Sequence, residues 1–161
     1  ALRLMHCLQT QRILNLISGL WVGSFITIGF LVAPILFSSL GDRQVAGMVA
    51  ASLFRTTAYL GVAISALLMV MASKLVNQGK DHYRSIRWIL LGMFACAVAA
   101  AFIIIPWMNS LRDQALYLDI SIRESTHAPL FNRLHGVSSI LFMIQSLLGV
   151  ALVWRATKNA V

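Results

Sequence analysis

His135 is the residue whose type and position in this chain most favour chemistry. It lies about two turns into the last predicted helix, near one end of an otherwise uncharged apolar stretch. Ionisable groups inside a membrane are costly and commonly have a function. An imidazole at this position could bind a ligand through its free nitrogen or carry a proton. In the alternative interpretation His135 is structural and hydrogen-bonds a neighbouring helix.

Haem or a metal ion is a second possibility for His135, and the other histidines limit it. His6 and His82 are expected toward the opposite side of the membrane, ~30 Å away. His127 precedes His135 by eight residues, which is about 12 Å along one helix and too far for a shared ion. We expect no cofactor, with haem or copper as the alternative. Mixed sites that use a methionine stay open, and these would pair His135 with Met108, or Met48 with His127.

Three arginines are expected on the same side of the membrane as His135, namely Arg55, Arg112 and Arg133. Together with the histidine they could form a polar pocket that faces outward over the bundle. Such a pocket would bind an anion or another small polar ligand. The alternative is a surface network of ion pairs with the acidic residues expected nearby, which are Asp113, Asp119 and Glu124.

Motifs of common catalytic sites are absent from the sequence. It contains no Walker phosphate loop, no HExxH, no CxxC and no GxSxG. Ser138 and Ser139 follow His135, but no acid or second base lies near them in sequence. Cys7 and Cys96 are the only cysteines, and we interpret them as free thiols or packing residues. We therefore expect no catalytic residue, no resident metal and no enzymatic activity.

Four long apolar stretches must position these residues. A helix needs about 18 or more apolar residues to cross ~30 Å of hydrocarbon, and lipid cannot satisfy the backbone of any other single segment. The 161 residues are 59% hydrophobic and only 11% charged, whereas soluble domains average about 25% charged residues. We predict an all-α, polytopic membrane four-helix bundle that forms one domain over residues 1–161, with spans at about 13–34, 56–73, 86–106 and 134–154.

The basic residues are unevenly divided between the two sides of the membrane. The termini and the connection at 74–87 hold eight basic residues and one acid, whereas the other two connections hold five basic residues and four acids. Because basic residues concentrate on the cytoplasmic side, both termini should lie in the cytoplasm. We expect an integral protein of a bacterial inner membrane. The net charge of +8 then reflects topology, and no nucleic-acid partner is expected.

The outer connections are predicted to contain amphipathic helical segments. Residues 43–55 should continue into the second span as one long helix, with Asp42 as its N-cap. Residues 109–125 combine an apolar stripe with charged positions and predict a helix on the outer surface. Pro34 and Pro106 fall in the outer ends of spans one and three, where each should kink its helix because proline removes a backbone hydrogen bond.

Small residues recur one helical turn apart at two places, Gly19 with Gly23 and Gly47 with Ala51. Small residues at this spacing let helices approach closely in lipid. We expect at least one of these faces to pack against another helix, from this chain or from a partner. The expected partners are therefore the lipid bilayer and either other membrane protein chains or further copies of this chain.

Several short segments together resemble a known family. They are Trp21-Val22-Gly23-Ser24, Val32-Ala33-Pro34-Ile35-Leu36-Phe37, Pro106-Trp107-Met108 and Phe131-Asn132-Arg133-Leu134-His135-Gly136. They resemble the four-span membrane family called domain of unknown function 4149, which is related to eukaryotic transmembrane protein 205. The resemblance covers most of the chain, and the stretch at 131–136 is its most specific part. It implies a four-helix membrane fold and no established reaction.

These features predict an integral membrane protein without enzymatic activity. It would act as an accessory or interaction component, or bind a ligand at a polar site on its outer face. Two alternatives remain open. One is a metal- or haem-handling membrane protein that uses His135, and the other is a small efflux or permease unit that works as an oligomer.

Overall fold

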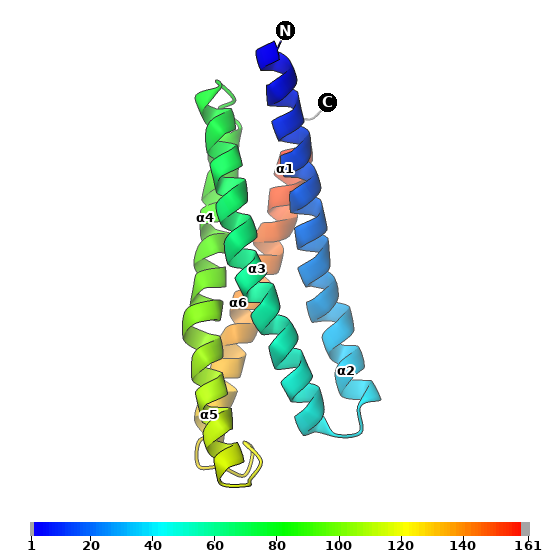
Figure 1. Ribbon diagram of the computed structural model, residues 1–161, viewed down its shortest axis with the longest axis vertical. Helices are drawn as coiled ribbons and strands as arrows, with labels where there is room; N and C mark the ends of the chain where they lie inside the picture. Colours follow the sequence, from blue (N-terminus) through cyan, green and yellow to red (C-terminus); the bar gives the residue numbers. More distant parts are fainter. Residues whose placement is uncertain (1, 159–161) are drawn as a thin grey trace.

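The computed structural model describes residues 2–158 and shows an all-helical chain folded into four long antiparallel helices (Figure 1). The first and third long helices each contain a short π-helix between two α-helices. Both termini lie at one end of the bundle, here called the termini end, and the opposite end is called the loop end. The elements in chain order are α1 (Leu2–Thr27), η1 (Ile28–Val32), α2 (Ala33–Ser39), α3 (Arg43–Asn77), α4 (Tyr83–Ala99), η2 (Ala100–Ile104), α5 (Ile105–Tyr117) and α6 (Ala128–Lys158).

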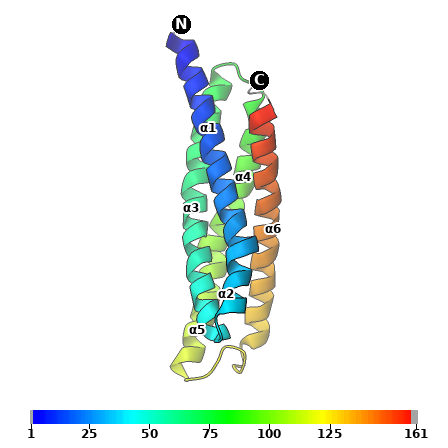
Figure 2. The same ribbon diagram turned by 90° about the vertical axis from the view of Figure 1, so that its right-hand side faces the viewer.

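The four long helices form a ring in which each has two main neighbours. α1 packs against α3 and α6, and α4 packs against the same two helices. Figure 2 shows the helices running side by side along the length of the bundle. Toward the loop end, α2 packs on α3 whereas α5 packs on α6. The short helices α2 and α5 therefore pack against different long helices.

All four helices are long and apolar enough to cross a membrane. The first three candidate spans have 35 residues each and the last has 31. At 1.5 Å per residue, 35 residues extend about 52 Å, which exceeds the ~30 Å hydrocarbon layer. Trp88 and Trp107 are separated by about 28 Å of helix, close to that thickness. The predicted fold class is confirmed, and the helices continue past the hydrocarbon at their ends.

Two clusters of buried apolar side chains hold the bundle together. The larger joins all four long helices, and its members include Leu14, Phe25, Leu68, Ile86 and Leu152. The smaller joins η2, α5 and α6 near the loop end and consists of Ile104, Leu111 and Leu134. On α6, the Phe142 ring stands edge-on to two other phenylalanines, with centroids 5.9 Å from Phe25 and 5.5 Å from Phe54. Phe142 thereby links α6 to α1 and α3.

Close approach between helices uses one glycine in each long helix. A β-carbon at Gly29 would overlap the Phe142 ring, and one at Gly149 would lie 3.0 Å from a methyl carbon of Val22. Gly61 and Gly92 are packed in a similar way against side chains of other helices. The glycines at the two predicted small-residue faces are different, because at Gly19, Gly23 and Gly47 no described atom of another helix lies within 4 Å of such a β-carbon. Contact of those faces with a partner stays a prediction.

The π-helices η1 and η2 each lie just before a proline. The N–H of Ala33 donates to the carbonyl of Ile28, and the N–H of Ile105 donates to the carbonyl of Ala100, which are i to i−5 bonds. Pro34 and Pro106 then occupy the first turn of α2 and α5, where a missing N–H is tolerated. The predicted kinks stay predictions, but each helix is locally widened at the expected place.

Hydrogen-bonded caps set three of the helix ends. The Asp42 carboxylate accepts from the N–H of Gln44 at 2.7 Å, which confirms it as the N-cap of α3. α3 ends at Asn77 and is followed by Gly79, which has φ +83°, and α5 ends at Tyr117 and is followed by Asp119, which has φ 54°. The N–H of Lys80 donates to the carbonyl of Leu75, and the N–H of Ile120 donates to the carbonyl of Ala115. Both are the i to i−5 hydrogen bonds of a Schellman motif.

The predicted surface helix at 109–125 is wrong. Residues up to Tyr117 continue the third long helix as α5, and 118–127 are turns and irregular structure. Pro106 does not break this helix because it stands in the first turn after η2. The break comes instead at Asp119, whose left-handed backbone ends the helix. The long helix expected from residue 43 into the second span is confirmed as α3.

Candidate functional site

His135 is exposed on the outside of α6. Its neighbour Leu134 belongs to the buried cluster at the loop end, so the histidine projects from a different face. The backbone carbonyl of His135 accepts a hydrogen bond from Ser139 at 2.9 Å. Its imidazole makes no hydrogen bond to a neighbouring helix within residues 2–158. The structural alternative, in which this ring locks two helices together, therefore gains no support.

The three arginines of the predicted outer site lie in different surroundings. Arg112 is half-buried on α5, and its guanidinium carbon lies 5.4 Å from the centroid of the Phe131 ring on α6. Arg55 and Arg133 are exposed on α3 and α6. Within the described chain, no hydrogen bond or ion pair joins any of them to His135 or to an acidic residue. The four-residue ligand site stays a prediction. Of the expected ion-pair network, the described residues show an electrostatic attraction between Arg112 and Asp113 but no close ion pair.

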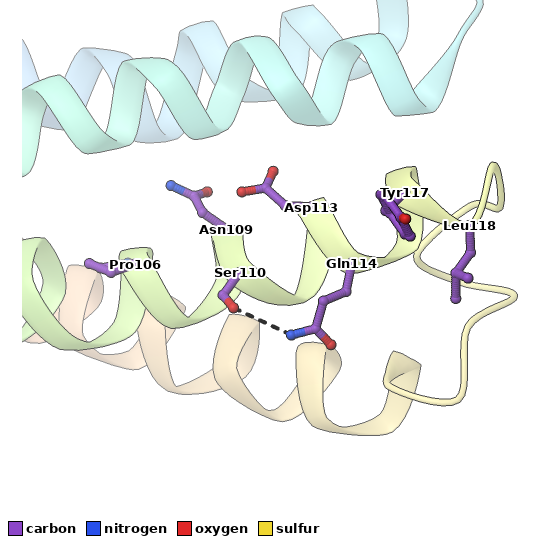
Figure 3. Close-up of a pocket in the computed structure, with 7 residues that line it drawn as sticks. All are labelled: Pro106, Asn109, Ser110, Asp113, Gln114, Tyr117 and Leu118. Carbon is purple, nitrogen blue, oxygen red and sulfur yellow. Dashed lines mark hydrogen bonds between the residues drawn. The ribbon is translucent and has the colours of Figure 1, made fainter.

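A shallow groove of about 600 Å³ runs along α5 near the loop end (Figure 3). Asn109 and Asp113 project toward the side on which α3 lies, and Ser110 and Gln114 project toward α6. The amide nitrogen of Gln114 donates to the hydroxyl of Ser110 at 3.5 Å. The residues that line the groove are Pro106, Asn109, Ser110, Asp113, Gln114, Tyr117 and Leu118.

The helical repeat explains why polar side chains gather along this groove. Positions 106, 109, 110, 113, 114 and 117 share one face of α5. The opposite face carries Leu111 and Ala115, which are buried, and Leu111 packs in the apolar cluster that joins α5 to α6. Sequence reasoning considered Asp113 only as an ion-pair partner and did not single out Asn109 or Gln114. The signal was present as a polar stripe at helical spacing.

The sequence predicts that most of the groove lies beyond the hydrocarbon layer. Trp107 marks the expected boundary of the third span, and Asp113 follows it by about 9 Å of helix. The carboxylate of Asp113 is exposed, interacts electrostatically with Arg112 and forms no close ion pair among the side chains described at 5–158. A charged carboxylate at headgroup level or in water carries little desolvation cost. It remains available to a ligand that enters the groove.

A second group of polar atoms lies inside the bundle. On α1, the side-chain oxygens of Asn15 and Ser18 and the indole nitrogen of Trp21 are buried without a hydrogen-bond partner in the described part of the chain. The Trp21 ring and the Gln145 amide both lie beside Gly61 of α3. Unpartnered buried polar atoms of this kind call for a physical explanation.

The described residues provide no cluster suited to a metal ion. Within 2–158, no group of three or more histidine, cysteine, aspartate or glutamate side chains comes together. His82, at the termini end, instead contacts the backbone, with its Nε2 atom 2.8 Å from the carbonyl oxygen of Arg155. This contact ties the turn between α3 and α4 to the last turns of α6. Its role is to hold the termini end together.

The fold defines the chain as a four-span helical membrane protein. Residues 16–116 match the family described as Domain of unknown function (DUF4149), and the chain belongs to this family. The matched range covers most of the first span, the second span, nearly all of the third span and most of the α5 groove. The segment at 131–136, which gave the most specific part of the resemblance, lies outside it. No curated protein and no solved structure matches the chain.

Proposed function

We propose that this protein is a non-enzymatic component of a bacterial inner membrane that binds a small polar ligand in the α5 groove, on the outer face. The observation that carries the proposal is the polar stripe of α5, which lines an open groove near the loop end. The position of Trp107 supports placing this stripe outside the hydrocarbon. A helix that only anchored the chain would need no continuous row of amide, hydroxyl and carboxylate groups there. The apolar face of α5 keeps this row fixed in orientation.

The chemistry of the lining favours a cationic or hydroxyl-bearing ligand over an anion. Asp113 is the only charged residue among the described residues that line the groove, and Asn109 and Gln114 supply amides that both donate and accept hydrogen bonds. None of the arginines of the predicted site contributes to the lining. An organic ammonium ion would pair with the carboxylate and donate its remaining hydrogens to the neighbouring amide oxygens.

The orientation of the site rests on the charge asymmetry. The termini end carries most of the basic residues, and this favours its placement in the cytoplasm. The α5 groove then faces the opposite compartment. An accessory role beside other membrane chains is compatible with the open faces at Gly19, Gly23 and Gly47, which leave room for helices of a partner.

Ligand binding can be tested on the protein in lipid nanodiscs. Saturation-transfer NMR with ethanolamine should show transfer to the ligand, whereas acetate at the same concentration should show none. Asp113→Asn should abolish the ethanolamine signal because it removes the charge that recognises the ammonium group. Asp119→Asn is the matched control, since Asp119 is exposed on the same side but does not line the groove. An equal signal for acetate, or a signal that survives Asp113→Asn, would rule out the proposed site.

A further inference from the structure

A second groove lies at the termini end, between α3 and α4. It has a volume of about 310 Å³ and is lined by Met69 of α3 together with Arg84, Arg87, Trp88 and Leu91 of α4. The four α4 residues are spaced so that they share one face of the helix. This groove therefore presents two guanidinium groups, one indole and two apolar side chains to the same space.

The two guanidinium groups lack acidic partners. Arg84 and Arg87 are both exposed, and neither forms an ion pair or a side-chain hydrogen bond with the side chains described at 5–158. Asp81, the acid nearest in sequence, lies in the turn before α4. Arginine presents a planar fork of donors that matches the oxygens of a phosphate group. An anion with phosphate geometry would satisfy both side chains at once.

The depth of the groove indicates what carries that phosphate. Trp88 is 71% exposed and lies about 28 Å along the helix from Trp107, so the two indoles mark the two membrane interfaces. Arg84 and Arg87 are then at headgroup level, and Leu91 lies one turn deeper, where hydrocarbon begins. A ligand that fits has a phosphate at one end and an apolar chain at the other.

We propose that this groove binds an anionic phospholipid. Its phosphate would lie between Arg84 and Arg87, and the start of one acyl chain would lie against Met69 and Leu91. Basic grooves between membrane helices on the cytoplasmic side are suited to anionic headgroups. The charge asymmetry assigns this end of the bundle to the cytoplasmic leaflet. The proposal is independent of the α5 groove, which is at the other end of the molecule.

Fluorescence of Trp88 tests the proposal directly. In a Trp107→Phe/Trp154→Phe background the remaining indoles are Trp88 and Trp21, and Trp21 is only 5% exposed. The protein is reconstituted in vesicles of phosphatidylcholine that contain increasing fractions of brominated phosphatidylglycerol or brominated phosphatidylcholine. The dependence of Trp88 quenching on the mole fraction of each brominated lipid gives the relative affinity of the protein for the two lipids. We expect a preference for phosphatidylglycerol on the order of tenfold, from two basic groups at the headgroup level.

Charge variants connect that preference to the groove. Arg84→Gln/Arg87→Gln should reduce the ratio to about one, and Arg84→Lys/Arg87→Lys should retain part of it because the charge remains. Arg43→Gln/Arg123→Gln is the matched control, since it removes two exposed charges at the loop end, and should leave the ratio unchanged.

Three outcomes would overturn the proposal. The first is equal quenching of the wild-type background by the two lipids. The second is a preference that survives in the folded Arg84→Gln/Arg87→Gln variant. The third is loss of the preference when millimolar inorganic phosphate is added, because the groove would then take a free anion. If the glutamine variant fails to fold, the wild-type comparison and the lysine variant decide the question.

Discussion

At the scale of single residues, four glycines have a different environment from the other glycines of the bundle. Gly29, Gly61, Gly92 and Gly149 each lie against a side chain of another helix, whereas Gly19 and Gly23 on α1 lie against nothing. Helical spacing could show that small residues recur on a face, but not which face meets a neighbour. That choice depends on the three-dimensional order of the four helices. The glycines predicted from spacing, Gly19, Gly23 and Gly47, are therefore ones that no other helix of the described chain packs against.

A pair of alanine substitutions separates these two kinds of glycine. Gly29→Ala should destabilise the protein by about 1–3 kcal/mol, because the added methyl group overlaps the Phe142 ring. That ring is held by Phe25, Phe30 and Phe54 and has little room to move. The control Gly19→Ala adds a methyl group in open space and should be neutral or stabilising by up to about 1 kcal/mol. Thermal unfolding in detergent measures both, and equal midpoints would contradict the packing described for Gly29.

The candidate site residues show the same limit of sequence reasoning. His135 was singled out because it is ionisable within an apolar stretch, yet it is exposed and its imidazole has no polar partner among the described residues. Asn109, Asp113 and Gln114 form the groove, although none was expected to bind a ligand. Ionisable type alone does not define a site. A site needs several polar groups on one face, and that depends on where the helix begins, ends and widens.

At the scale of elements, the apolar stretches predicted the four spans because lipid permits only helices there. The ends of the helices were harder to predict. The start of α3 followed from Asp42, a common N-capping residue. The end of α5 was missed because Asp119 adopts a left-handed backbone that is more usual for glycine. The sequence predicted a kink at Pro34 and at Pro106, but it did not predict the π-helices that precede the two prolines.

The π-helix η2 sets the orientation of the α5 groove, and this gives a prediction for Pro106→Ala. The alanine restores an N–H donor, so η2 should return to the α-helical repeat. A π-helical turn holds about one residue more than an α-helical turn. Conversion of η2 to the α-helical repeat would therefore rotate α5 by about 100° relative to α4, because each residue turns an α-helix by that angle. Spin labels at Ser52 and Gln114 should then change separation by on the order of 5 Å.

Pro129→Ala is the matched control for this substitution. Pro129 lies in the first turn of α6, where proline is tolerated and no π-helix follows. Its replacement should leave the distance between the two labels as it is in the wild-type protein. An unchanged distance in Pro106→Ala itself would show that packing of η2, and not the proline, maintains the wide turn.

At the scale of the whole molecule, the two ends of the bundle have different chemistry. The termini end has a groove with two arginines and a tryptophan, which suits an anionic headgroup. The loop end has a groove with one carboxylate and several amides, which suits a small cationic or hydroxyl-bearing ligand. Four antiparallel helices bring both termini and the turn at 78–82 to one end. The charge asymmetry of the sequence follows the same division.

The central claim is that the α5 groove faces outward and the termini end faces the cytoplasm. Cysteine labelling in intact cells tests it most directly, in a background with Cys7 and Cys96 replaced by alanine. A membrane-impermeant maleimide should modify a cysteine at Gln114, within the groove, and should modify one at Gln78, in the opposite turn, only after the cells are opened. Labelling of Gln78→Cys in intact cells, with Gln114→Cys protected, would contradict the orientation and the proposed outer ligand site.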